Sequence, residues 1–437
     1  MKRLLRGITM TALASVVFFS GCRGKNTAAG TGKNNKTVSI MFQGSDAEQA
    51  AIKGVTERFT AKTGINVELL YTPHDSYTEK LAGYISNKTM PDIISIDGPN
   101  LANLVWGGHV ACIEDYIDKD IISDMTKSNV AQCTYPVDNK LYAIGQSDST
   151  VLLYANKKYL TRIGARIPKS VDDAWTVEEF DDILSKLSKL PEVRWPLDIM
   201  WAWNIAGSEW GTYGFYECLS SAGSDLINRA TWKAEGTLNN DASVKALTYF
   251  QKWNKNGWIV PKSAGDNTLY NDKHETAIAW NGNWAYQAVF ASLGDDAVAI
   301  PLPNFGKGTR TPNATWIWGI TSASGKKVQA GQLLSFMMKD TQFLDELKAT
   351  GAYPALKSFA ARCEDYNDPS KMAIAYEQSD YAVSRPLHPA YPTITIEFAN
   401  AFDSILNGTD AKTALDKAAA AIDADIADND GYPPFGK

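Results

Sequence analysis

Thirteen tryptophans occur in this 437-residue chain, and several lie beside short polar side chains. A tryptophan ring is a large flat apolar surface that stacks on ligands, fills interfaces or builds a core. Residues 195–216 hold four tryptophans and two tyrosines next to Glu209, and three glycines in this stretch predict a loop. We expect at least one of these rings to contact a ligand, whereas others fill the core. The candidates are Trp201, Trp203 and Trp210.

Polar candidates follow two of the predicted strands. Gln43 and Asp46 come after the first strand, and Asp97 and Asn100 come after the third. Side chains at the carboxyl ends of parallel strands are placed to contact a ligand. Asp46 has an alternative role, because an aspartate at the start of a helix caps backbone amides. Both roles stay open for Asp46.

The elements that must position these residues begin with an alternation of strands and helices. Strands are predicted at 38–42, 66–71 and 93–96, and helices at 46–64 and 77–86. This order implies an α/β fold with a parallel sheet that is covered by helices on both faces. Ligands of such sheets bind beyond the carboxyl ends of the strands.

The remaining chain repeats the theme without an internal sequence repeat. Trp316 and Trp318 stand two apart in a strand-like run, so their side chains share one face. Further strands are predicted at 275–280 and 297–301, and helices at 175–190, 328–339 and 410–426.

The N-terminus has the three-part layout of a secretory signal. Residues 1–6 are basic, residues 7–19 are uncharged and mostly apolar, and Ser20 and Gly21 precede Cys22. The uncharged run is shorter than the roughly 20 residues of a membrane-spanning helix. Small residues before a cysteine resemble the lipobox of bacterial lipoproteins, so we expect residues 1–21 to be a signal peptide and Cys22 to be lipidated. An ordinary cleaved signal is the alternative.

Residues 22–36 are rich in Gly, Asn, Thr and Lys and show no apolar periodicity, which predicts a flexible tether. The protein is therefore expected at the extracellular face of the cytoplasmic membrane, held there by lipid. Removal of Lys2, Arg3 and Arg6 with the signal would change the formal net charge from −6 to −9. An acidic chain lacks the basic face that nucleic-acid binding needs.

Four segments, in this order, resemble the solute-binding lipoproteins of carbohydrate ABC importers, the family that includes maltose-binding proteins. Their order along nearly the whole mature chain is more specific than any one of them. They are 59–67 (FTAKTGINV) with 90–96 (MPDIISI), the stretch 141–156, 275–286 (ETAIAWNGNWAY), and 385–391 (RPLHPAY) with 405–408 (ILNG).

The resemblance implies a two-lobed periplasmic-binding-protein-like fold with a hinge and a ligand cleft between the lobes. The first lobe would hold residues 37–146 and 302–365, and the second 150–299 and 370–437. A ligand that contacts both lobes favours the closed state, which the transmembrane permease subunits recognise. No chemical step, cofactor or metal is expected, and a monomer suffices.

A sugar presents apolar C–H faces to aromatic rings and hydroxyl pairs to planar polar groups. By the resemblance, Trp284 stacks on sugar, Asp148 lies in a hinge crossing, Trp316 and Trp318 lie near the cleft floor, and Arg385 and Tyr391 belong to a C-terminal signature. The expected ligand-binding residues are Gln43, Asp46, Asp97, Asn100, Asp148, Trp203, Glu209, Trp210, Trp284, Trp316, Trp318, Arg385 and Tyr391. The many tryptophans favour an oligosaccharide.

Two other functions compete with this interpretation. An extracellular glycoside hydrolase would need two carboxyl groups about 5–9.5 Å apart. A receptor of the same fold for a polyamine would need an acidic aromatic box, which Asp46, Asp97 and Glu209 could supply. Four cysteines remain beyond Cys22, either as free thiols or as disulfides. The pairs expected for disulfides are Cys112–Cys133 and Cys218–Cys363.

Overall fold

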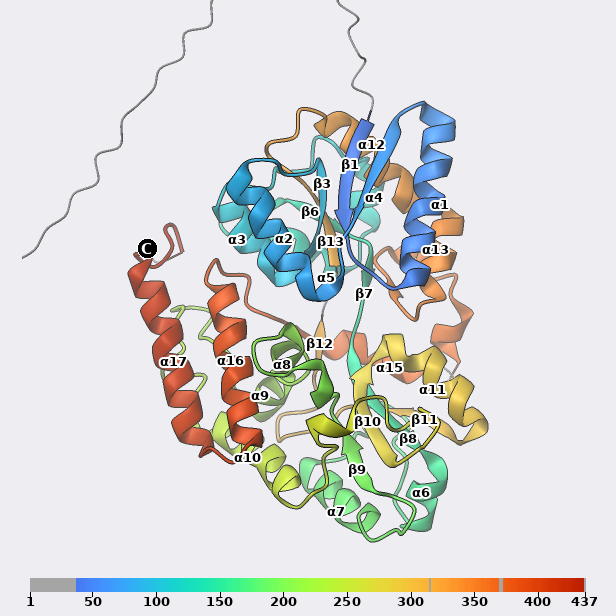
Figure 1. The fold of residues 1–437 in the computed structure, drawn as a ribbon, viewed down its shortest axis with the longest axis vertical. Coiled ribbons are helices and arrows are strands. Elements are labelled where there is room, and N and C mark those ends of the chain that lie inside the picture. Colours follow the sequence, from blue (N-terminus) through green and yellow to red (C-terminus); the bar gives the residue numbers. More distant parts are fainter. Residues whose placement is uncertain (1–36, 314–315, 369–371, 436–437) are drawn as a thin grey trace, which may run out of the picture. The chain divides into compact units, whose positions relative to one another are not determined.

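The computed structural model describes residues 37–313, 316–368 and 372–435. Its first sheet has the strand order β2-β1-β3-β13-β6 (Figure 1). As the sequence predicts, β1 runs parallel to β2 and β3, whereas β13 runs antiparallel to β3 and β6. The strands are β1 (Thr37–Phe42), β2 (Asn66–Tyr71), β3 (Ile93–Asp97), β6 (Ala143–Gly145) and β13 (Trp316–Ile320).

Helices cover this sheet and define the first lobe. In α1, Ser45 and Glu48 form a capping box at the start, and Gly64 ends the helix with a φ of 70°. A left-handed residue after the last turn is the usual place for glycine. The helices are α1 (Asp46–Thr63), α2 (His74–Asn87), α3 (Leu101–Trp106), α4 (Lys119–Asp124), α5 (Lys127–Cys133), α12 (Lys327–Lys339), α13 (Thr341–Lys348) and α14 (Lys357–Ala360).

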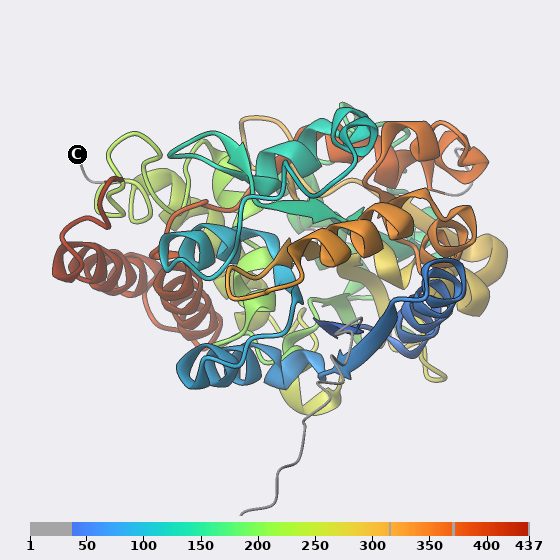
Figure 2. The same cartoon turned by 90° about the horizontal axis from the view of Figure 1, so that it is seen from above.

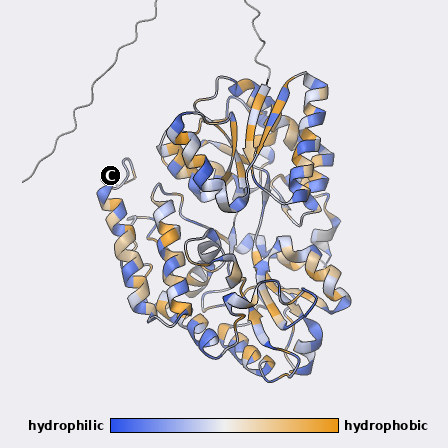
Figure 3. Cartoon of the chain, viewed as in Figure 1, coloured by the Kyte–Doolittle hydropathy of each residue, from blue (hydrophilic) through white to orange (hydrophobic). Residues whose placement is uncertain are grey.

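The second sheet has the order β11-β8-β10-β9 and defines the second lobe. Its strand β10 (Thr276–Gly282) is buried along its whole length, as expected for a central strand. Figure 3 shows hydrophobic residues along the strands of both sheets, which places the cores between sheets and helices. The other strands are β8 (Val151–Asn156), β9 (Trp195–Asp198) and β11 (Ala297–Ile300).

The helices of the second lobe come from two stretches of the chain. Figure 2 shows the last two, α16 and α17, side by side. The helices are α6 (Lys157–Arg162), α7 (Val177–Leu187), α8 (Glu209–Tyr213), α9 (Glu217–Ala222), α10 (Asp241–Lys255), α11 (Tyr286–Leu293), α15 (Ala373–Glu377), α16 (Tyr391–Leu406) and α17 (Ala411–Asp428).

Short strands mark the passages between the lobes. The chain leaves the first sheet after β6, runs through β7 to β8, and returns through β12 to β13 (Figure 1). A third passage leads from α13 towards α16. Two pairs of strands bind the passages together: β7 (Ser147–Asp148) with β14 (Tyr353–Pro354), and β12 (Thr311–Asn313) with β15 (Ala382–Ser384). A short hairpin of β4 (Thr134–Tyr135) and β5 (Lys140–Leu141) lies outside both sheets.

Some sequence predictions need correction. The loop predicted within 195–216 is confined to the connection between β9 and α8, which contains the 3-10 turn η2 (Trp201–Trp203). The helix predicted from residue 175 begins at Val177, where Thr176 caps it, and Trp175 is buried before it. The two disulfides considered from the sequence, Cys112–Cys133 and Cys218–Cys363, are not formed, because Cys112, Cys133 and Cys218 carry free thiols.

The N-terminal predictions lie outside the described residues. The signal peptide, the lipidated Cys22 and the tether all fall within residues 1–36. Among the described helices, none combines the length and the apolar character that a membrane crossing requires. The boundaries of the two lobes stay a prediction.

Candidate functional site

A cavity of about 620 Å³ lies between the two lobes. It sits at the carboxyl ends of β1 and β3, beside β7 and opposite α8 and α11, which is where an α/β fold places ligands. Both lobes and two of the passages between them contribute to it. The lining residues include Gln43, Ser45, Glu48, His74, Asp97, Ser147, Asp148, Ser149, Trp203, Glu209, Trp210, Tyr213, Asn283, Trp284, Gln287, Trp316, Thr350, Ala352 and Arg385.

Aromatic rings of the second lobe form one side of the cavity. Trp284 stacks on Tyr213 with ring centres 6.1 Å apart, and Trp210 meets Trp284 edge to face at 6.2 Å. The indole of Trp210 is fixed by a 3.0 Å hydrogen bond to the Ile199 carbonyl. Trp284 stays 38% exposed and therefore offers a ring surface to a ligand.

A glycine determines where the Trp284 ring lies. A Cβ atom on Gly282 would come within 2.1 Å of that ring, so only glycine lets the indole lie across the end of β10. The 3-10 turn η4 (Asn283–Ala285) then places Trp284 two residues beyond the strand. The short segment from Gly282 to Trp284 is thus built to present the ring.

Trp316 contributes from the first lobe. Its ring lies 5.7 Å from His74 and 5.4 Å from Tyr77, both edge to face. Trp316 begins β13 opposite Asp97, at the edge of the sheet that borders the cavity. Trp318 lies two residues farther along β13, is only 1% exposed and does not line the cavity. Of the two candidate rings, Trp316 lines the cavity and Trp318 does not.

Arg385 joins the two lobes at the cavity. Its guanidinium donates two hydrogen bonds of 2.9 and 2.8 Å to Asp97 of the first lobe, and a third to Glu209 of the second. Tyr391 and Thr395 of α16 also donate to Glu209. We call these five residues the Arg385 cluster.

Electrostatics decide the charge state of this cluster. Burial raises the pKa of Glu209, although Arg385 opposes that shift. Burial also disfavours the charge on Arg385, but Asp97, Tyr391 and Glu209 outweigh it and raise its pKa. Arg385 therefore stays a cation held by two carboxyl groups. Tyr391 is fully buried and, unlike its partners Arg385 and Glu209, does not line the cavity.

Asp148 is a buried carboxyl group in the hinge strand β7. It accepts hydrogen bonds of 3.0 and 2.9 Å from Asn313 of β12, one from Ser128 of α5, and one of 2.9 Å from the backbone amide of Ser149. Burial nevertheless raises the pKa of Asp148 to about 6. The side chain therefore ties two hinge passages to a helix of the first lobe at the edge of the cavity.

Comparison with known proteins assigns the family. Residues 54–375 match the family model described as bacterial extracellular solute-binding protein. The chain belongs to this family. The solute-binding protein is 22% identical to the galactooligosaccharide-binding protein of Bacillus subtilis over 445 residues, which cover 96% of each chain.

Solved structures establish the fold. A solute-binding protein from Thermotoga lettingae, bound with α-D-tagatose, has a TM-score of 0.76 at 21% identity and covers 89% of this chain and 99% of its own. A substrate-binding protein from Listeria monocytogenes, in complex with cycloalternan, has a TM-score of 0.76 at 18% identity, with coverage of 90% and 99%. These likenesses confirm the two-lobed periplasmic-binding-protein-like fold.

Besides Trp318 and Tyr391, two further expected site residues of the solute-binding protein do not line the cavity. Asp46 is the exposed first residue of α1, and Ser45 rather than Asp46 caps the helix. Asn100 is the last residue of the 3-10 turn η1 (Gly98–Asn100), which follows Asp97, and Asn100 is not among the residues that line the cavity. Both follow the strand ends, but the turns that begin there carry them past the cavity.

Other lining residues were missed in the sequence. Ser45, Glu48 and His74 lie at the starts of α1 and α2, where a search for all polar residues after strands would have found them. Asn283 stands beside Trp284 and could have been found from its position. Thr350 and Ala352 carry no local signal, because they reach the cavity only through the packing of α13 on α1.

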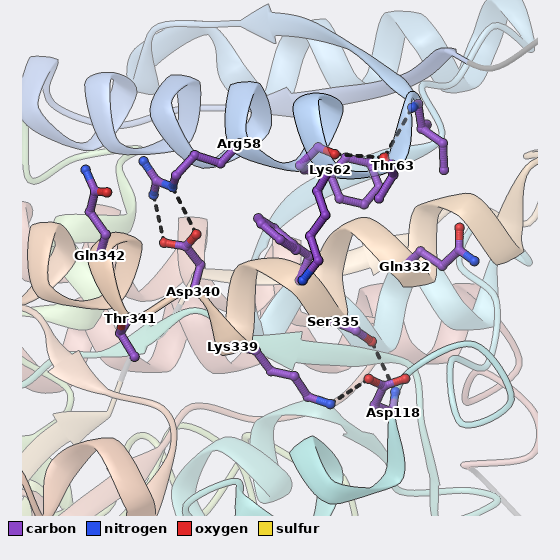
Figure 4. Close-up of a pocket in the computed structure, with 13 residues that line it drawn as sticks. Arg58, Lys62, Thr63, Asp118, Gln332, Ser335, Lys339, Asp340, Thr341 and Gln342 are labelled. Atoms are coloured by element: carbon purple, nitrogen blue, oxygen red, sulfur yellow. Dashed lines mark hydrogen bonds and ion pairs between the residues drawn. The ribbon is translucent and has the colours of Figure 1, made fainter.

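A larger cavity of about 940 Å³ lies on the first lobe between α1, α12 and α13. Figure 4 shows that its charged groups face each other: Arg58 binds Asp340 at 2.8 Å and Lys339 binds Asp118 at 2.6 Å. Its size does not make it the ligand site, because these charges are already paired and its two rings, Phe59 and Phe336, pack on one another.

Proposed function

We propose that this protein captures an oligosaccharide in the interlobe cavity and delivers it to the permease subunits of an ABC importer without a chemical step. The observation that carries the proposal is the exposed Trp284 ring, set in an aromatic wall opposite planar polar groups. Rings for C–H faces and planar polar groups for hydroxyls are what sugar binding requires. The galactooligosaccharide-binding relative supports the same class of ligand.

The Arg385 cluster favours a neutral ligand over a polyamine. A polyamine site needs carboxylates whose charge is not already compensated. Asp97 and Glu209 both bind Arg385, and Asp46 lies outside the cavity lining. The same contacts oppose a hydrolase that would use Asp97 and Glu209 as its two carboxyl groups, because both are bound to Arg385.

The N-terminal part of the proposal rests on the sequence alone. A lipid on Cys22 would hold the protein at the extracellular face of the membrane, and the tether would let the two lobes reach the permease. We propose a monomer, because the cavity is completed by the two lobes of one chain.

The first test is thermal unfolding of the purified full chain with galacto-, malto- and fructooligosaccharides and with polyamines. A ligand at 100 times its Kd adds about 2.7 kcal/mol to stability and raises Tm by a few degrees. Chromatography of the sugar afterwards distinguishes a receptor from a hydrolase. Sugar consumption, or a shift with polyamines alone, would overturn the proposal.

Trp284→Ala tests the residue that carries the argument. Loss of stacking and of buried ring surface should weaken sugar affinity about 10- to 100-fold, which isothermal titration calorimetry would measure. Trp106→Ala is the matched control, because Trp106 is similarly exposed at 41% and lies outside the cavity lining. Equal affinities of the two variants would argue against this site.

A further inference from the structure

A turn of the first lobe borders the cavity beside Trp284. It follows α13 and consists of Ala349, Thr350, Gly351 and Ala352, three of which line the cavity. Backbone hydrogen bonds from Thr350 to Leu347 and from Gly351 to Lys348, both 3.0 Å long, hold the turn to the end of α13. We call this segment the 349–352 turn.

The 349–352 turn rests directly on the second lobe. The Gly351 carbonyl accepts a hydrogen bond from the Asn283 side chain. Gly351 has a φ of 84°, and a Cβ atom there would come within 2.7 Å of the Asn283 carbonyl oxygen. Only a glycine at residue 351 allows the two backbones to approach this closely.

Asn283 also connects this contact to the hinge. The side-chain oxygen of Asn283 accepts a 3.0 Å hydrogen bond from the backbone amide of Thr150, and the backbone amide of Asn283 donates one of 3.0 Å to the Thr150 carbonyl. Tyr353 follows the turn and lies in β14, where it pairs with Asp148 of β7. The Tyr353 hydroxyl also shares a 3.1 Å hydrogen bond with the Thr150 hydroxyl. A continuous hydrogen-bonded wall therefore runs from β7 to Trp284.

The wall is also supported from behind. Tyr366 donates a 2.8 Å hydrogen bond to the Ala352 carbonyl. Arg58 of α1 binds Asp340, which caps the start of α13. The turn is thus supported at both ends beside the Trp284 ring.

We propose that the 349–352 turn ends the sugar-binding cavity, so that the protein binds an oligosaccharide by a chain end rather than by an internal stretch. A chain bound through its interior must leave the cavity on both sides, and the contact between Gly351 and Asn283 fills one of them. This inference rests on the proposed function and specifies its ligand as a chain terminus.

Sugars blocked at one end test the inference. The oligosaccharide that stabilises the full chain most is linked to polyethylene glycol through its reducing end or, separately, through its non-reducing terminal ring. At least one of the two conjugates should bind 10-fold or more weakly than the free sugar in calorimetry. If both bind within twofold of the free sugar, the cavity is open at both ends and the inference is wrong.

Gly351→Ala should specifically change this discrimination. The added Cβ atom pushes the turn off Asn283, so free-sugar affinity should fall at least threefold and the penalty for the blocked sugar should shrink. Gly408→Ala is the matched control, because Gly408 has a φ of 98° and open space around its Cα. Identical behaviour of the two variants would overturn the inference. If no sugar binds the unmodified protein, the proposed function itself fails.

Discussion

Asp148 is the residue where the hinge and the cavity share one titratable group. Its ordinary pKa in an unfolded chain is about 3.9, whereas burial raises it to about 6 in the folded protein. Between these two values the folded protein keeps a proton that the unfolded chain has released. The stabilisation from this proton is complete below the unfolded pKa and is lost as the pH rises through about 6.

Asp148→Asn should remove this contribution to the pH dependence of stability. Chemical unfolding at pH 4.5 and 7.5 should show the wild type losing about 2 kcal/mol more than the variant across this range. The amide can be accommodated, because the side-chain oxygens of Asn129 and Asn313 have no hydrogen-bond partner of their own and can turn to accept from it. An unchanged difference between the two pH values would contradict the assignment.

Asp120→Asn provides the control for Asp148. Its hydrogen bond to Lys339 lowers the pKa of Asp120, so the sign of the effect is reversed. Its interaction supplies stability that is present at neutral pH and lost on acidification. The Asp120 variant should therefore leave the decline of stability towards pH 7.5 in place.

Helix α1 shows how one element serves both stability and the site. The Ser45 amide donates a 2.8 Å hydrogen bond to Glu48, and the Glu48 amide donates one of 3.3 Å back to the Ser45 hydroxyl. Both residues line the cavity. A capping box of the same kind, Thr176 with Glu179, starts α7 away from the cavity. A comparison of the two capping boxes therefore separates the contribution of a cap to stability from its contribution to ligand binding.

Ser45→Ala and Thr176→Ala should each lower the free energy of unfolding by about 1 kcal/mol, because each leaves a helix amide without its cap. Only Ser45→Ala should also weaken sugar binding, since it removes a hydroxyl group from the cavity lining together with its hydrogen bond to Glu48. Denaturant titration measures the first effect and calorimetry the second. Equal sugar affinities of the two variants would place the start of α1 outside the binding site.

At the scale of the whole molecule, the Arg385 cluster links the two lobes. Arg385 is nearly completely buried and bidentate to Asp97, whereas Glu209 holds it from the second lobe. Weakening the contact to Asp97 leaves the guanidinium with its second-lobe partner. The lobes should then separate more easily, so that a ligand must use more of its binding free energy to close them and its apparent affinity falls.

Asp97→Asn should therefore increase the population with a longer distance between the lobes. Spin labels at Lys53 on α1 and Lys245 on α10 would report that distance by pulsed electron paramagnetic resonance. Asp340→Asn is the control, because it breaks another bidentate arginine pair, with Arg58, inside one lobe. A distance distribution that shifts equally in both variants would show that the Arg385 cluster does not couple the lobes.

Several parts of the fold could be predicted because they depend on local patterns. The alternation of 66–71 matches β2 to the residue, and Gly64 ends α1 where predicted. The helix α8 within residues 195–216 could not be predicted from a local pattern, because the glycines around it suggested a loop. Gly211 is instead needed for close packing, because a Cβ atom there would come within 2.3 Å of the Ile205 carbonyl oxygen. The sequence alone does not distinguish a glycine that is needed for close packing from a glycine that is needed for a turn or loop.

The sequence by itself determined the family and the α/β architecture. It also named nine residues that line the cavity, out of thirteen expected, because strand ends and aromatic segments are local features. Only the tertiary structure decided which of the candidate residues line the cavity. Trp316 and Trp318 have the same residue type and strand, yet one borders the cavity and the other is core, because their depth in the sheet differs. The contact of Gly351 with Asn283 and the contact of Arg385 with Asp97 each join residues that are far apart in the chain. Only the packing of the two lobes brings these residues together.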